Sequence, residues 1–144
     1  MAKVFEKGDF RSGYYRDQTF MFAINELSVK QFFSGLYANT SFNEEPMSGG
    51  RQMNSHFSSV FLNDNGSFKD LTNQYNISSD ISPTSGQMPR LLGLAMASKL
   101  YRNGNFNSEK FSNNGNEIVW GTIGNASTSE GLFFEVVNAV GVHQ

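Results

Sequence analysis

The chain has 144 residues, a length that favours a single domain with its own core. Its 11 basic and 13 acidic residues give a formal net charge of −2, which argues against a nucleic-acid-binding surface, and the absence of cysteine excludes disulfides and thiolate metal sites. The polar residues 1–9 do not resemble a signal peptide, and no apolar run approaches the roughly 18 residues of a membrane span. We therefore expect a cytoplasmic protein without a membrane segment.

The first forty residues predict a short strand followed by helix. Residues 1–12 form a charged lead-in that is compatible with the tail of a helix, and the aromatic residues 13–15 are compatible with a brief strand. Over residues 19–38 apolar side chains recur at spacings of three and four, which indicates helix, and Ser28 is placed to cap its second part. That second part carries an apolar stripe made of Phe32, Phe33, Leu36 and Tyr37.

Residues 39–87 are rich in turn-forming sequence and show little regular periodicity. Such long connections are usually functional or disordered, and the 14 phenylalanines of the chain argue against disorder. Within this segment His56 is interpreted as a structural or solvated histidine. Glu44 and Glu45 are interpreted as solvated acids rather than a pair for general acid–base chemistry.

Residues 87–102 predict a helix with Pro89 in its first turn, and residues 103–116 predict a surface loop. The helix residues expected to face a core are Leu91, Leu92, Ala95, Leu100 and Tyr101. Its small residues would let another backbone come close; they are Gly93, Ala95 and Ala97.

The clearest pattern lies in residues 118–123, which are apolar on both faces and predict a fully buried parallel strand. Residues 124–126 turn the chain, and Ser127 with Glu130 matches a capping box, so a helix is expected to begin there. The residues expected to bury this helix are Leu132, Phe133, Phe134, Val136, Val137 and Val140. In open parallel sheets a ligand binds at the carboxyl end of the strand, where this turn lies.

The sequence thus predicts an α/β fold, an open and mostly parallel sheet flanked by helices. One long strand cannot make such a sheet, and the chain stops at Gln144, where a second strand should follow. We expect residues 1–144 to be a truncated domain, a fragment of a longer protein.

The turn at 124–128 is the first of three segments that suit a phosphate. A helix start offers unpaired backbone N–H groups, and Asn125 adds a carbonyl oxygen that suits Mg²⁺. An ordinary turn with Asn in a left-handed conformation explains the same residues and is favoured when this motif is taken alone. Two histidines, no cysteine and scattered acids offer no zinc ligand set, and the chain has no Walker lysine motif or Gly-x-Gly-x-x-Gly.

The other two segments are Tyr15-Arg16 and residues 82–89. Arginine is a bidentate phosphate ligand and tyrosine a hydrogen-bond donor, but a surface arginine paired with Asp17 or Asp9 is the simpler explanation of Arg16 alone. Residues 82–89 offer small hydroxyls and backbone groups, although a capped helix start is the favoured explanation when this segment is taken alone.

In chain order these motifs form one series. They are Tyr-Arg at 15–16, Ser-Gly-Gly-Arg-Gln-Met-x-x-His at 48–56, Ser-Pro-Thr-x-x-Gln-Met-Pro at 82–89 and Gly-Asn-Ala-Ser-x-Ser-Glu-Gly at 124–131. The series resembles the alpha part of the E1 component of 2-oxo acid dehydrogenase complexes, from about Val4 to the end of the chain. It is most similar to the branched-chain type, 2-oxoisovalerate (3-methyl-2-oxobutanoate) dehydrogenase, which includes bacterial forms with fused alpha and beta parts.

The resemblance implies that thiamine diphosphate binds between an alpha and a beta part. Tyr15 and Arg16 would hold its diphosphate end, and Ser82 and Thr84 match positions that contact the cofactor. The residues that match the family's Gly-Asp-Gly motif for diphosphate and Mg²⁺ are Gly124, Asn125, Ala126 and Ser127, with Asn125 as the metal ligand.

The sequence also departs from the family pattern. The family usually has an acidic residue where this chain has Asn125, and the lost charge should weaken the grip on Mg²⁺. Ala126 replaces a glycine, a small change if its φ is negative. The downstream asparagine segment that completes the metal site, the histidine of the phosphorylatable loop and the beta-part glutamate are absent.

The implied reaction is oxidative decarboxylation of a 2-oxo acid with acyl transfer to the lipoyl group of an E2 partner. We expect no turnover from the isolated chain. The alternative is a non-catalytic binding or assembly module with a decayed metal site. We expect the apolar side chains of Phe32, Phe33 and Tyr37, and the small face of Gly93 and Ala97, to meet missing segments or other subunits of an oligomer, unless they form the chain's own core.

Overall fold

The structure, a computed structural model, describes residues 1–53, 55–104 and 106–143. Gln144, at which we expect the domain to be cut off, lies outside the described residues. The same holds for Asn54 of the turn-rich segment and Asn105 of the predicted surface loop.

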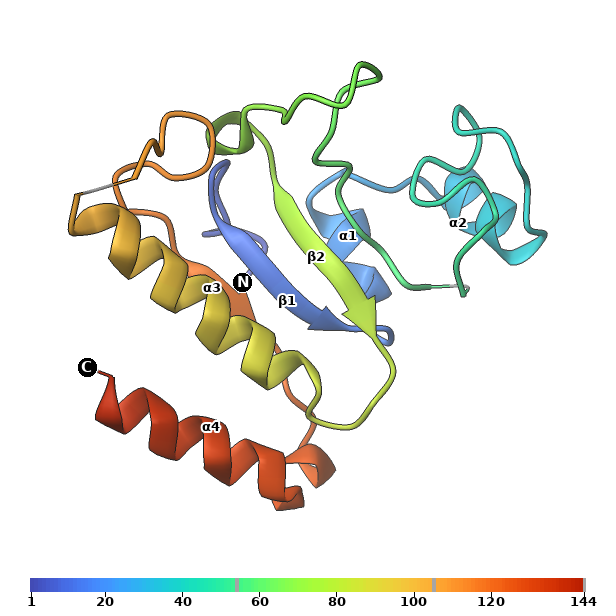
Figure 1. The fold of residues 1–144 in the computed structure, drawn as a ribbon. Coiled ribbons are helices and arrows are strands. Elements are labelled where there is room, and N and C mark those ends of the chain that lie inside the picture. Colours follow the sequence, from blue (N-terminus) through green and yellow to red (C-terminus); the bar gives the residue numbers. More distant parts are fainter. Residues whose placement is uncertain (54, 105, 144) are drawn as a thin grey trace.

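Three parallel strands form the sheet of the described chain, in the order β2-β1-β3 (Figure 1). They are β1 (Phe10–Tyr14), β2 (Asn76–Ile81) and β3 (Val119–Gly121). In the central strand, Phe10 lies opposite Asn76 on one side and Val119 on the other. The predicted α/β class with an open parallel sheet is therefore confirmed.

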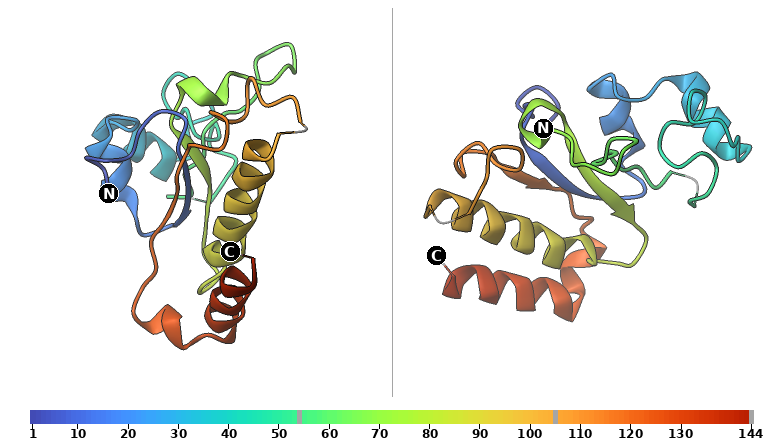
Figure 2. Two further views of the ribbon diagram at one scale, coloured as in Figure 1. Left: turned by 90° about the vertical axis from the view of Figure 1, so that its left-hand side faces the viewer. Right: turned by 45° about the horizontal axis from the view of Figure 1, so that its top comes forward.

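Helices cover both faces of this sheet. Figure 2 shows α1 (Gln18–Ala23) on one face and α3 (Gln87–Arg102) on the other, with α4 (Gly131–Val142) lying beside α3. The helix α2 (Val29–Leu36) and the loop that follows it extend beyond the sheet on the side of α1. Two short 3₁₀ helices complete the described elements, η1 (Leu71–Asn73) and η2 (Ala126–Ser129). No helix in the described part of the chain combines the length and apolar character that crossing a bilayer requires.

The main hydrophobic core lies on the α1 face of the sheet. Met21 of α1 and Ile77 of β2 are each 1% exposed at its centre. The phenylalanines 5, 20 and 57 surround them, with the rings of Phe5 and Phe20 packed edge to face at 5.2 Å between centroids. Several of the phenylalanines therefore pack in a hydrophobic core, in agreement with the expectation that the chain is not disordered.

Two helix predictions are confirmed by local geometry. The helix predicted over residues 87–102 has these bounds in α3. Ser28 caps α2 through a capping box, in which its hydroxyl accepts from the amide of Gln31 and the Gln31 side chain accepts from the amide of Ser28. The region predicted as helix over residues 19–38 breaks between the two helices, where Asn25 adopts a left-handed backbone with φ 59°.

The strand β2 was not predicted from the sequence pattern. It lies within residues 39–87, and its sequence, Asn-Ile-Ser-Ser-Asp-Ile, is largely polar. The side chain of Asn76 is buried because its Nδ2 donates to the carbonyls of Gly8, Asp9 and Leu71, at 3.3, 3.3 and 2.8 Å. Buried polar residues that find partners elsewhere in the chain remove the apolar periodicity on which a strand prediction rests.

The beginning of the chain also differs from its prediction. The brief strand predicted at residues 13–15 begins earlier, at Phe10, and residues 1–9 form turns rather than the tail of a helix. Asp9 organises this end of the sheet, since its carboxylate accepts from the amide of Ile118 and from the indole Nε1 of Trp120, each at 2.8 Å.

The last strand is shorter and more exposed than predicted. Residues 118–123 were expected to form a fully buried strand, but only Val119–Gly121 pair, and they form an edge of the sheet. Ile118 is 53% exposed because no further strand or helix of the described chain lies beside it. The apolar side chains of residues 118–123 therefore form an edge of the sheet that the described residues leave partly exposed.

The capping box predicted from Ser127 and Glu130 does not form. The residues from Ala126 to Ser129 make the separate 3₁₀ helix η2, and α4 begins only at Gly131. Glu130 occupies the N-cap position of α4 with an extended backbone and without a side-chain capping bond. The small turn thus leads into a short 3₁₀ helix, not into the first turn of a long α-helix.

Large apolar side chains of the helices remain exposed, contrary to the predicted burial. On α3, Ala95 and Leu100 point to solvent instead of a core. On α4 only Val136 is buried, while the residues more than half exposed are Phe134, Val137, Val140 and Val142. On and beside α2 the exposed members of the predicted stripe are Phe33, Leu36 and Tyr37. These side chains do not form the chain's own core.

Glu45 is not a solvated acid, as its loop position suggested, but the centre of the loop that follows α2. Its carboxylate accepts from the amides of Met47, Ser48 and Gly50 at 2.8–3.0 Å, and from the Ser48 hydroxyl at 2.8 Å. Burial raises the pKa of Glu45, but these hydrogen bonds outweigh burial and hold its pKa below the ordinary range. One ionised carboxylate therefore orders the glycine-rich turn.

We expect Gly13→Ala to destabilise the fold, because a Cβ at Gly13 would lie 2.1 Å from Nη2 of the fully buried Arg11 side chain. The guanidinium cannot move aside without leaving its carboxylate partners, so we expect the free energy of unfolding to fall by about 2–3 kcal/mol in urea denaturation. Gly93→Ala is the matched control, since a Cβ there meets no atom within 4 Å, and the change should be neutral or slightly stabilising. Equal effects of the two substitutions would contradict this account.

Candidate functional site

The residues predicted to bind a phosphate follow the three strands at one edge of the sheet. Residues 15–16 come directly after β1, residues 82–84 after β2 and residues 124–127 shortly after β3. Because parallel strands end at the same edge, the topology brings the three segments together. The first two are in direct contact, since the amide of Tyr15 donates to the carbonyl of Ile81 at 3.2 Å.

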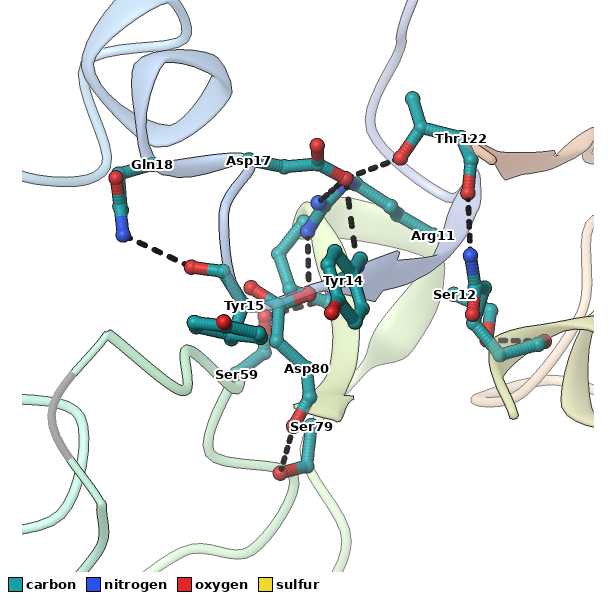
Figure 3. A network of polar contacts seen from close by, with 12 residues as sticks. Arg11, Ser12, Tyr14, Tyr15, Asp17, Gln18, Ser59, Ser79, Asp80 and Thr122 are labelled. Carbon is teal, nitrogen blue, oxygen red and sulfur yellow. Dashed lines mark hydrogen bonds and ion pairs between the residues drawn. The ribbon is translucent and has the colours of Figure 1, made fainter. Parts of the chain in front are cut away.

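Asp17 links the end of β1 to the end of β3. Its Oδ2 accepts from the amide of Tyr14 at 3.3 Å and from the hydroxyl of Thr122, two residues before Gly124 (Figure 3). The same oxygen receives Nη2 of Arg11 at 2.9 Å. The segment that carries Arg16 is therefore fixed relative to the turn at 124–127.

Arg11 connects this link to β2. Its side chain is fully buried on the face of the sheet covered by α1, where its Nη1 contacts Oδ1 of Asp80 at 2.8 Å and its guanidinium lies 4.9 Å from the centre of the Phe20 ring. Burial raises the pKa of Asp80 to about 6, although the adjacent Arg11 opposes the rise. One buried cation thus holds carboxylates from two different segments.

A second set of hydrogen bonds joins residues 82–87 to the turn after β3. The Ser85 hydroxyl donates to the carbonyl of Ser127 at 2.5 Å, and Nε2 of Gln87 donates to the carbonyl of Thr122 at 2.7 Å. Ser12 of β1 donates to the carbonyl of Gln87 at 2.9 Å. The start of α3 is in this way tied to all the segments of the carboxyl edge.

Arg16 is exposed, and neither Asp17 nor Asp9, the two carboxylates expected to pair with it if it were an ordinary surface arginine, forms an ion pair with it. Asp17 pairs with Arg11, and Asp9 accepts from residues at the other end of β3. Within the described ranges no carboxylate forms an ion pair with Arg16, whose Nε donates to the hydroxyl of Tyr15 at 3.0 Å. This hydrogen bond lowers the pKa of Tyr15. The guanidinium is therefore oriented and remains available to an anion.

The backbone of the turn at 124–127 presents amide groups that could donate to a phosphate. Asn125 has φ −56° and ψ −42°, a right-handed conformation in place of the expected left-handed one. Among the described residues, the amides of Asn125 and Ala126 have no hydrogen-bond acceptor, and both residues are exposed. Ala126 lies in η2 with a negative φ, so a side chain is tolerated where the similar motif has glycine. Two free amides at a helical turn fit a diphosphate group.

The fit to a divalent metal is weaker. Asn125 offers one neutral oxygen, and no group of three or more histidine and acidic side chains suited to a metal occurs in the described part of the chain. A hard cation such as Mg²⁺ binds where several oxygens, usually including a carboxylate, converge. The residues present therefore fit the diphosphate better than they fit its metal.

Ser82 and Thr84 flank Pro83 in the turn after β2. Thr84 is exposed, whereas Ser82 is half-buried and its hydroxyl lies 2.5 Å from Nε2 of His56. His56 in turn stacks on the ring of Tyr15. His56 belongs to the same series of sequence motifs. A single histidine in a long loop, however, gave no reason to expect a contact with Ser82 or Tyr15.

A comparison with models of protein families shows the family of the chain. A model described as the dehydrogenase E1 component matches residues 1–144. The chain belongs to this family. A comparison with curated proteins gave no match.

Dehydrogenase E1 components are the thiamine-diphosphate-dependent part of 2-oxo acid dehydrogenases. They work in complexes with an E2 component, often together with an E1 beta subunit. The family and the cofactor class expected from the resemblance are thus confirmed, and the parallel sheet of the chain agrees with the thiamine-diphosphate-binding fold.

The elevated pKa of Asp80 predicts a pH-dependent stability. Its pKa of about 6 in the fold exceeds the value of roughly 4 expected in the unfolded chain, so the folded state binds more protons between these values. The free energy of unfolding should therefore decrease as the pH rises from 4 to 6, by at most about 3 kcal/mol from this group.

Asp80→Asn imitates the protonated acid and should remove this dependence. Urea denaturation between pH 4 and 7 should show the variant gaining stability relative to the original protein as the pH rises. Asp64→Asn, on an exposed turn, serves as the control. A variant that instead loses relative stability with rising pH would mean that the attraction to Arg11 exceeds the cost of burying the carboxylate.

Proposed function

We propose that the described residues supply the diphosphate-binding part of a thiamine-diphosphate site in an E1 component of the branched-chain type. The observation that carries the proposal is the convergence of Arg16, the turn at 82–84 and the turn at 124–127 at one edge of the sheet. A cation that has no carboxylate partner, and two amides that have no acceptor, among the residues the structure describes are thus held together by one network of hydrogen bonds.

Each segment has a distinct part in the proposed site. The guanidinium of Arg16 binds the terminal phosphate, oriented by Tyr15. The amides of Asn125 and Ala126 donate to the diphosphate, with Gly124 and Ser127 shaping the turn. Ser82 and Thr84 contact the cofactor from the turn after β2. This arrangement anchors the cofactor by its charged end and leaves its reactive ring beyond the described residues.

The overall reaction is oxidative decarboxylation of the 2-oxo acid, in which the lipoyl disulfide of E2 both accepts the two electrons and takes the acyl group. When bound, thiamine diphosphate would supply the nucleophilic carbon and the electron sink that this chemistry requires. The residues of this chain bind and orient the cofactor and contribute no proton transfer. The branched-chain type is proposed from the resemblance of the motif series, and the ratio of kcat/KM for 2-oxoisovalerate to that for pyruvate, measured on the native E1 component, tests it.

The exposed apolar side chains of α4 support a partner-dependent site. Phe134 is 62% exposed, and Val137 and Val140 are each 51% exposed, on a helix that follows the proposed diphosphate turn. A beta part, fused or separate, and a lipoyl-bearing E2 are the proposed partners, in an oligomer whose cofactor site is shared between parts. We retain the cytoplasm as the predicted compartment.

A second candidate function rests on Asn125. A neutral amide at the proposed metal position, in a chain whose described residues contain no group of three or more metal-binding side chains, is compatible with a non-catalytic binding or assembly module. In that case thiamine diphosphate would bind without dependence on Mg²⁺ or would not bind. The two functions therefore differ in a measurable linkage between metal and cofactor.

Arg16→Gln should weaken binding of thiamine diphosphate to the native E1 component roughly 10- to 100-fold, because a charge-assisted bond to phosphate is lost. Titration calorimetry measures the change. Arg102→Gln is the control, since Arg102 contacts the Gly115 carbonyl at the opposite end of α3. Unchanged affinity after the Arg16 substitution would remove Arg16 from the site.

Asn125→Asp should strengthen the Mg²⁺ dependence of cofactor binding about tenfold, because a carboxylate replaces a neutral oxygen at the proposed metal position. The measurement is the Kd of thiamine diphosphate across a Mg²⁺ titration. If neither protein shows any dependence on Mg²⁺, Asn125 is not a metal ligand and the binding-module alternative is favoured.

A further inference from the structure

His56 lies between two of the proposed cofactor contacts. Its Nε2 is 2.5 Å from the Ser82 hydroxyl, and its ring stacks on that of Tyr15 with 5.5 Å between centroids and 6° between planes. Tyr15 follows β1 and Ser82 follows β2, so the imidazole joins the ends of two neighbouring strands.

The backbone around His56 is held firmly, although it belongs to a long connection between α2 and β2. The next residue, Phe57, is buried in the main core, and its carbonyl accepts from the amide of Asp80 at 2.8 Å. Gln52 crosses to the outer side of β2, where its Nε2 donates to the Ser79 hydroxyl at 2.8 Å. The imidazole is therefore presented by an ordered segment, which is a condition for positioning another side chain.

The stack on Tyr15 extends to Arg16. The guanidinium carbon of Arg16 lies 5.3 Å from the centre of the Tyr15 ring, while its Nε donates to the hydroxyl of the same residue. The orientation of the proposed phosphate-binding cation thus depends on a tyrosine whose ring is held by His56.

The contact with Ser82 affects what that hydroxyl can offer a ligand. A serine hydroxyl has one proton, so it cannot donate both to an imidazole nitrogen and to a phosphate. If Nε2 carries the proton and donates to Ser82, the hydroxyl proton is directed elsewhere and becomes available to an anion at the carboxyl edge. His56 in this tautomer would convert a half-buried hydroxyl into a donor for the cofactor.

We propose that His56 is a positioning residue of the diphosphate site, which holds the hydroxyl of Ser82 and, through Tyr15, the guanidinium of Arg16 in the arrangement that binds phosphate. The inference rests on the proposed function. It assigns His56 no contact with the substrate and no role in proton transfer during the reaction.

The test uses the native E1 component with every chain that it contains. His56→Phe keeps an aromatic ring on Tyr15 but loses the bond to Ser82, and we expect the Kd of thiamine diphosphate to rise about tenfold. His56→Gln keeps a hydrogen-bonding group but loses the stack, and we expect a rise of about threefold. His143→Phe, at the exposed end of α4, is the matched control and should leave the Kd unchanged.

A double-mutant cycle separates positioning from a general effect on the fold. In the Ser82→Ala background, His56→Phe should change the Kd less than twofold, because the hydroxyl that it positions has been removed. A structural role alone would lower the thermal midpoint and weaken binding equally in both backgrounds, which would overturn the inference.

The outcome also distinguishes this inference from the proposed function. If the original protein binds thiamine diphosphate and both His56 substitutions leave the Kd unchanged, the role of His56 is overturned while the proposed function stands. If the original protein does not bind thiamine diphosphate, the proposed function fails and the inference fails with it.

Discussion

The carboxyl edge of the sheet depends on the burial of Arg11 between Asp80 and Asp17. Asp80 belongs to β2, while Asp17 follows β1 and also receives the hydroxyl of Thr122 after β3. One guanidinium therefore connects the ends of all three strands. Removing a single partner from such a buried arrangement leaves an uncompensated charge, which costs far more than the loss of a surface pair. The segments that carry the proposed phosphate contacts are positioned by this interaction, although none of its members is itself proposed to touch the cofactor.

Elements whose signals are local were predictable from the sequence. The bounds of α3 and the capping box of Ser28 depend on residues within a few positions of one another. By contrast, β2 was not predicted, because its polar residue Asp80 is buried through an ion pair with Arg11, which lies 69 residues earlier in the chain. No window of sequence shows that a polar residue will find such a partner. The prediction of a fully buried strand at residues 118–123 was wrong for a different reason. An apolar run indicates that its side chains are buried, but not whether the same chain or a partner covers them.

The candidate site shows the same division. The order of motifs brought out Arg16, Ser82 and Asn125, which follow three neighbouring strands as the parallel topology requires. The side chains that arrange them were missed. His56 and Asp17 act through contacts with residues distant in sequence. Outside the site, Glu45 was taken for a solvated acid although it accepts four hydrogen bonds. Motifs thus identify groups that face a ligand, whereas the groups behind them emerge only from the fold.

The central position of β1 has a consequence for the order in which the chain acquires structure. Phe10 pairs with Val119, so the first strand has a neighbour 109 residues later, and its other neighbour, Asn76, lies 66 residues away. At a synthesis rate of roughly 5–20 residues per second, β1 leaves the ribosome about 5–20 s before its last partner exists. During that interval β2 and the carboxylates that pair with Arg11 are already made, but the edge of β1 that will pair with β3 has only water or other proteins as hydrogen-bond partners. Nascent chains of this protein therefore present an unfinished sheet to the cell until residues 119–121 have been made.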